Sequence, residues 1–167
     1  MSNELREFLK EQIHIIFNDK SVLTRKLYMI IYSKIYDFCI RKNKNKDMGM
    51  LDKKTHDRSQ RGELYNYLIN VVKDISLTYR IQINTSNHSI DTYNKLYNNF
   101  NICSKILDNL FEYFNRIYVK ENFDESNLLF IEECRLVWFK TIVHNNPSFI
   151  NKIINTINEC RNQQSFL

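Results

Sequence analysis

Apolar residues recur along most of the chain at intervals of three and four positions. This spacing puts them on one face of an α-helix. The pattern predicts helices over residues 3–17, 21–42 and 62–82. Ser21 is a candidate cap for the second of these helices, because a serine hydroxyl can accept a hydrogen bond from a free backbone N–H.

The same period continues through the C-terminal half of the chain. Over 90–121 it predicts two helices with a bend near 100–103, preceded by Ser89 as a cap. A sixth helix is expected over 126–144. The single proline of the chain then fits the first turn of a last helix over 147–162.

Two stretches lack this period. Residues 43–60 are polar and charged, which predicts a flexible basic loop, and residues 121–127 predict a loop or turn. The chain has 2 glycines and 1 proline, too few for the frequent turns of an all-β fold. We therefore expect one all-α domain, a bundle of about six or seven long helices.

Alanine is absent from the sequence, whereas asparagine, isoleucine, lysine and tyrosine are abundant. Because alanine is the strongest helix former, these helices must be held by tertiary packing rather than by propensity. The bias also suggests codon usage in an AT-rich genome, such as that of a large DNA virus or some protists.

The formal net charge is +5, and much of the excess lies in one basic run. The run consists of Arg41, Lys42, Lys44, Lys46, Lys53 and Lys54. Such a run usually forms a solvated loop. The alternative is a basic helical protein that binds nucleic acid through phosphate contacts.

Candidate catalytic and metal-binding motifs are few. The four cysteines form no CxxC pair and have no histidine at metal-ligand spacing. A cysteine–histidine nucleophile stays open because its partners need not be adjacent in sequence. We expect no enzyme activity, cofactor or metal. The charged N-terminus and the lack of a long apolar stretch predict an intracellular protein with reduced thiols and no membrane span.

Tyrosines at positions 28, 32 and 36 follow an i, i+4, i+8 spacing that aligns them along one side of the second helix. Ile31 and Ile35 lie beside them. Such a stripe is either half-buried core or an adhesive surface, because tyrosine combines a large rigid contact area with a hydroxyl.

Several segments, taken in order, resemble the N-terminal region of cullins. LYMIIYSKIYDFC (27–39) is similar to the second cullin helix, and GELYNYL (62–68) to the start of the third. The strongest similarity is TYNKLYNNFNICSKILDNLFEYFNRIYVKEN (92–122), and it continues in RLVWFKTIV (135–143) and INECRNQQ (157–164). Among cullins, the chain is most similar to the cullin of SCF (Skp–cullin–F-box) ligases.

The resemblance implies a scaffold with a cullin-repeat fold, whose second and fifth helices bind a Skp-type adaptor carrying an F-box protein. Carried over by position, the expected adaptor-binding residues are Tyr28, Ile31, Tyr32, Ile35, Tyr36, Tyr113, Asn115, Arg116 and Ile117. The alternative for Asn115 and Arg116 is that they tie helices together.

The resemblance further implies one truncated N-terminal domain over 1–167, with a first repeat over 1–122 and the start of a second over 123–167. Nothing matches the half of a cullin that holds the RING protein, so we expect no RING partner. The expected function is a viral cullin mimic in the host cytoplasm or nucleus that inhibits or redirects SCF ligases. The alternatives are nucleic-acid binding, which we do not favour, and a viral helical bundle that binds a host signalling helix.

Overall fold

The computed structural model describes residues 2–40, 50–116 and 129–164. Within these ranges all regular structure is helical and no strand is present, which confirms the all-α prediction. The elements in chain order are α1 (Asn3–Asn18), the 3₁₀ turn η1 (Lys20–Val22), α2 (Arg25–Ile40), α3 (Met50–Thr85), α4 (Ser89–Leu110), α5 (Glu112–Phe114), α6 (Phe130–Trp138), the π-helical segment η3 (Phe139–His144) and α7 (Pro147–Gln164).

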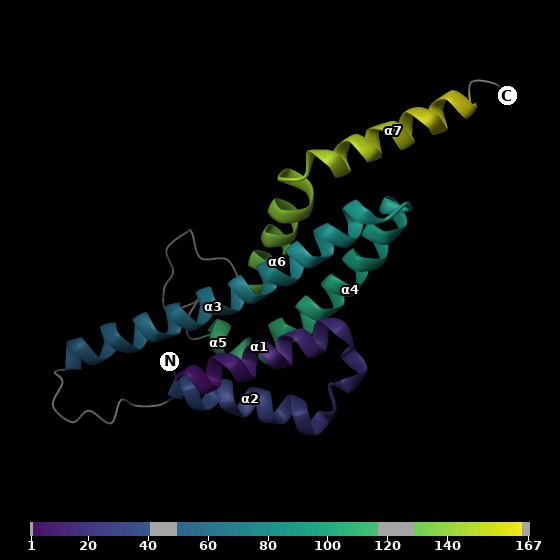
Figure 1. The fold of residues 1–167 in the computed structure, drawn as a ribbon. Coiled ribbons are helices and arrows are strands. Elements are labelled where there is room, and N and C mark those ends of the chain that lie inside the picture. Colours follow the sequence, from purple (N-terminus) through teal and green to yellow (C-terminus); the bar gives the residue numbers. More distant parts are fainter. Residues whose placement is uncertain (1, 41–49, 117–128, 165–167) are drawn as a thin grey trace.

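The long helix α3 runs along the body of the molecule (Figure 1). α1 packs against α2, α3 and α4 on one side, and α6 packs against α3 and α4 on the other. One apolar cluster joins these helices, and its fully buried rings come from Phe100, Phe111, Phe114, Phe130 and Phe149. Burying each ring stabilises the fold by roughly 1.5–3 kcal/mol. Packing of this kind supplies the stability that an alanine-free sequence lacks in helix propensity.

Polar side chains fix the end of α1 against its neighbours. The carbonyl of Phe17 accepts hydrogen bonds from the Asn99 amide of α4 (2.9 Å) and from the Tyr79 hydroxyl of α3 (3.3 Å). Asn99 also donates to the Tyr79 hydroxyl at 3.1 Å. A carbonyl in the last turn of a helix has no partner within that helix, so these bonds satisfy it and set the position of α1.

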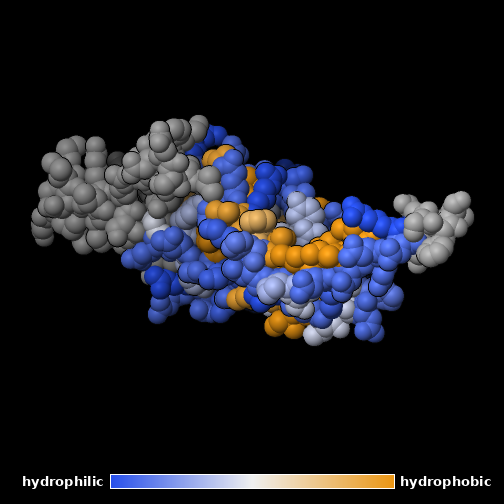
Figure 2. Space-filling model, turned by 90° about the horizontal axis from the view of Figure 1, so that it is seen from above, coloured by the Kyte–Doolittle hydropathy of each residue, from blue (hydrophilic) through white to orange (hydrophobic). Residues whose placement is uncertain are grey.

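α7 is fixed at its base and projects away from the body (Figure 1). The side-chain amides of Asn84 and Asn146 donate to each other's oxygens at 3.2 and 3.1 Å, and Lys152 Nζ donates to the carbonyl of Asn84 at 2.9 Å. Farther along α7, Ile154 and Ile157 are 48% and 47% exposed. Figure 2 shows apolar residues gathered on the face toward the end where α7 lies.

The structure moves the starts of two helices in the N-terminal half. α2 begins at Arg25, so the prediction that Ser21 caps it is wrong. The Asp19 carboxylate accepts bonds from the Ser21 N–H (3.0 Å) and hydroxyl (2.6 Å), which draws 20–22 into η1, and Thr24 Oγ1 accepts from the backbone of α2 at 3.2 Å. α3 begins at Met50, so the predicted loop over 43–60 is wrong for 50–60, and its part over 43–49 lies outside the described residues. Extending a nucleated helix adds one hydrogen bond per residue and needs no apolar face.

Further boundaries change after α3. Ser89 is the first residue of α4, and its hydroxyl donates to the Ser86 carbonyl at 2.9 Å instead of capping the helix. α4 continues without the predicted bend at 100–103, because Phe100 and Cys103 point into the same core, and it ends before Phe111.

The end of the predicted sixth helix and the start of the last helix at the proline are confirmed. The predicted turn at 121–127 and the repeat boundary at 122/123 lie outside the described residues.

Candidate protein-binding surface on α2 and α5

The three tyrosines of α2 lie along one edge of the helix, as their spacing predicts. Tyr28, Tyr32 and Tyr36 are all half-buried, so each ring has one side against the protein and part of its surface in solvent. The rings of Tyr32 and Tyr36 stack with centroids 6.4 Å apart at 15°. Both interpretations of the stripe therefore hold in part: it borders the core and also contributes surface.

Ile31 and Ile35 do not contribute to this surface. Their side chains are 2% and 1% exposed and belong to the apolar core. Within one helix turn they project inward beside the tyrosines, because residues at i+3 and i+7 from Tyr28 lie closer to the centre of the buried face. The prediction that Ile31 and Ile35 belong to the contact surface is therefore corrected. Both side chains lie beneath the stripe and anchor α2 in the core.

Exposed apolar side chains extend the stripe outward. Met29 and Ile40 are 52% and 44% exposed, and they lie one helix turn from Tyr32 and Tyr36 respectively. Together Met29, Tyr32, Tyr36 and Ile40 form a ridge, which we call the α2 ridge. The sequence prediction missed Met29 and Ile40, although their spacing of three and four from the tyrosines was a usable signal.

α5 joins the α2 ridge through an aromatic contact. Tyr113 is half-buried, and its ring centroid lies 4.6 Å from that of Tyr36 at an interplanar angle of 51°. Arg116 is exposed and donates to the Glu112 carboxylate at 2.9 Å. The structure thus brings Tyr36, Tyr113 and Arg116 to adjoining positions, and Ile117 lies outside the described residues.

Asn115 has a supporting position rather than a surface one. It is 8% exposed, and its Nδ2 donates to Asp108 Oδ1 of α4 at 2.9 Å. This bond holds the segment after α5 against α4, which matches the alternative that Asn115 ties helices together. The prediction that Asn115 belongs to the contact surface is therefore corrected, because its side chain is buried against α4.

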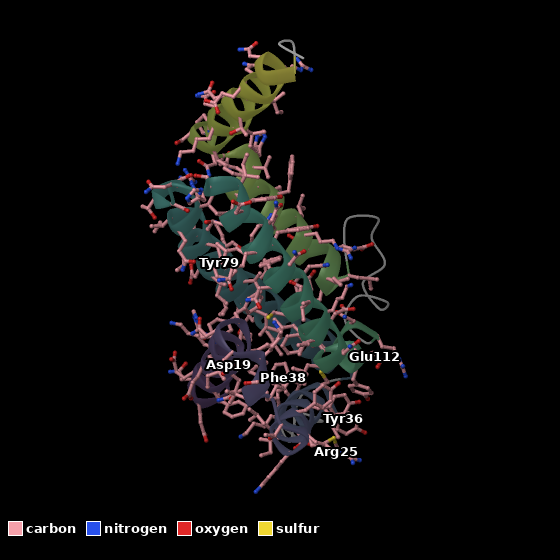
Figure 3. All side chains as sticks on the ribbon, turned by 90° about the vertical axis from the view of Figure 1, so that its right-hand side faces the viewer. Asp19, Arg25, Tyr36, Phe38, Tyr79 and Glu112 are labelled. Atoms are coloured by element: carbon pink, nitrogen blue, oxygen red, sulfur yellow. The ribbon has the colours of Figure 1, made fainter. Side chains whose placement is uncertain are left out.

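The electrostatic environment acts on the Tyr28 hydroxyl at the edge of this surface. Burial raises the pKa of Tyr28, and the nearby Glu112 carboxylate and Tyr32 raise it further. Tyr36, Arg25 and Glu112 lie along the same edge of the molecule in Figure 3. The surface therefore offers tyrosine hydroxyls, apolar area and charges of both signs, a combination suited to a protein partner.

Two of the buried thiols, those of Cys103 and Cys134, lack the lowered pKa of a nucleophile. Burial raises the pKa of Cys103 to about 11 and that of Cys134 to about 12, whereas a nucleophilic cysteine needs a lowered pKa. Among the described residues, no group of three or more metal-binding side chains comes together. Over the same residues, none of the helices has the length and apolar character needed to cross a bilayer.

Comparisons with known proteins agree with this architecture. The family model described as the cullin alpha solenoid domain matches residues 6–167. The chain is similar to cell division control protein 53 of Saccharomyces cerevisiae, with 26% identity over 144 residues. That alignment covers 81% of this chain and 17% of the yeast protein, so the chain spans a small part of that relative's length. No solved structure matches the chain.

Proposed function

The chain belongs to the cullin family, and on that premise we propose that it binds a Skp-type adaptor carrying an F-box protein. The α2 ridge and Tyr113 would form the contact surface. The observation that supports this most is the contact between Tyr36 and Tyr113, because it makes one continuous aromatic surface from two helices. Aromatic side chains at the centre of an interface supply most of the binding energy.

The consequence would be competition for the adaptor. A chain that occupies the adaptor through this surface would exclude another cullin from the same adaptor. We propose that it acts in the cytoplasm of a host cell as a viral mimic and lowers the pool of adaptor available to full-length cullin. In a reconstituted SCF reaction, added chain should reduce substrate ubiquitination in proportion to adaptor occupancy.

The direct test mixes the chain with a purified Skp-type adaptor–F-box complex, followed by size-exclusion chromatography and calorimetry. We expect a one-to-one-to-one complex. Tyr32→Ala should weaken binding by about 2 kcal/mol or more if Tyr32 is central to the contact. The matched control is Ile81→Ala, because Ile81 is an apolar residue of α3 that is 64% exposed and outside the α2 ridge. It should leave the affinity unchanged.

Two outcomes would refute the proposal. One is the absence of a complex at tens of micromolar with a chain that circular dichroism shows to be helical. The other is equal affinity for the Tyr32 variant and the wild type. A salt titration separates the nucleic-acid alternative, because phosphate contacts weaken steeply with salt whereas an aromatic surface should be nearly insensitive.

A further inference from the structure

α4 and the α6–η3 segment enclose a cavity that is separate from the α2 ridge. Its volume is about 200 Å³. α6 packs against both α3 and α4, and it lies beside α3 in Figure 1. The aromatic residues that line the cavity are Tyr93, Tyr97, Phe100, Trp138 and Phe139. Nothing in the proposed adaptor contact uses this site.

The aromatic wall is fixed by contacts between its own rings. The Trp138 centroid lies 4.7 Å from that of Phe100, 5.5 Å from Tyr97 and 5.8 Å from Tyr93. Tyr93 and Tyr97 stack with centroids 5.9 Å apart at 1°. Trp138 itself is 3% exposed. A ligand entering the cavity would meet a wall that is already ordered, so little entropy would be lost on binding.

The rim of the cavity exposes apolar surface. Phe139 is 51% exposed and Tyr97 is 38% exposed. Phe139 begins η3, in which the Asn145 N–H bonds to the Lys140 carbonyl at 3.1 Å, five residues back. π-helical turns of this kind occur frequently at functional sites.

The lining of the cavity includes one charged side chain, and that charge is positive. Arg135 lines the cavity, is exposed, and makes no ion pair with any other described residue. One turn earlier, the Glu132 carboxylate accepts from the Leu129 N–H at 3.1 Å, so it already caps α6. Two further exposed lysines directly follow lining residues in the sequence: Lys105 follows Ser104 of α4, and Lys140 follows Phe139 of η3. An anionic group would therefore be attracted to this lining.

We propose that this cavity binds a segment of a partner protein that presents one bulky apolar side chain flanked by carboxylates. The volume supports a single side chain, because pockets for small molecules usually measure roughly 300–1,000 Å³. The aromatic wall suits an aromatic or large aliphatic anchor. Arg135 supplies the charge complementarity for an acidic flank.

The single tryptophan of the chain makes the test direct, since Trp138 lines the cavity. The probe is a capped pentapeptide with a central phenylalanine between two pairs of glutamates. We expect a saturable change in tryptophan fluorescence with a Kd of about 1 mM or tighter. Arg135→Glu should weaken binding about fivefold or more. Lys73→Glu, an exposed charge reversal on α3, should leave it unchanged.

The opposite results are equally specific. An equal response to a peptide with lysines in place of the glutamates, or with alanine in place of phenylalanine, would overturn the proposal. The lack of any saturable response would also overturn it. A fluorescence change that depends on the concentration of the chain without peptide would do the same, because a second copy of the chain would then fill the cavity. Because Tyr32→Ala leaves this site intact, its titration should match wild type whatever the outcome for the adaptor.

Discussion

Replacing Tyr36 and Tyr113 with leucine, singly and together, measures the contact that joins α2 to α5. The centroids are 4.6 Å apart at 51°, a tilted geometry that is worth about 1 kcal/mol beyond the burial of the rings. Tyr36→Leu also removes the stack with Tyr32, at 6.4 Å. That loss occurs in both the single and the double variant, so the double-mutant cycle cancels it.

The assay is urea unfolding followed by circular dichroism. With a slope of about 2 kcal/mol per molar urea, a coupling of 1 kcal/mol corresponds to about 0.5 M in the double difference between the four midpoints. The control cycle combines Tyr36→Leu with Tyr97→Leu. Tyr97 has Tyr93 and Trp138 as aromatic neighbours, and Tyr36 has Tyr32 and Tyr113, so the two sites have none of these neighbours in common. Its two effects should add to within about 0.5 kcal/mol.

A coupling below about 0.5 kcal/mol would refute the reasoning, because the effects of distant and independent substitutions add to within that amount. The rings would then not hold α5 against α2. The continuous aromatic surface on which the adaptor proposal depends would lose its energetic support.

Three other predictions concern stability. Thr24→Ala removes the cap of α2 and should lower the free energy of unfolding by about 1 kcal/mol, seen as a melting temperature about 2–4 °C lower. Asn115→Ala breaks the bond to Asp108 and should cost about 1 kcal/mol, whereas Arg116→Ala, at an exposed ion pair, should change stability by about 0.5 kcal/mol or less. Burial raises the pKa of Cys103 from 9.0, the ordinary value for a thiol, to about 11 in the fold. The stability that the neutral buried thiol contributes is therefore fully present below pH 9 and is lost as pH rises toward 11. Melting curves between pH 8 and 10 should shift downward, and a rise would contradict the burial of this thiol.

The sequence predicted most helices because each has a face that must be buried, and the three- and four-residue period records that requirement. It could not set every boundary. The start of α2 depends on Asp19, whose carboxylate closes a short turn around Ser21. The break at Phe111 depends on where α4 ends in the packed core, rather than on any local helix breaker.

The candidate surface was predicted in its position but not in its membership. The spacing places Tyr32 and Ile35 on neighbouring edges of α2, but only packing shows that Ile35 is buried whereas Met29 is exposed. The cavity was beyond prediction altogether. Its walls bring Tyr97 of α4 together with Arg135 of α6, and no local pattern relates residues that far apart.

The π-helical segment η3 sets the direction in which α7 leaves the body of the molecule. A π-turn holds one residue more than an α-turn, and one residue corresponds to a rotation of about 100° around a helix axis. Substitutions that restored α-helical hydrogen bonds over 139–144, with the chain length unchanged, would rotate everything after this segment by about that angle. Asn146 would then no longer face Asn84, and α7 would leave the body in another direction. The direction of the last helix is therefore set by the hydrogen-bond register of η3, whose turns hold one residue more than those of an α-helix.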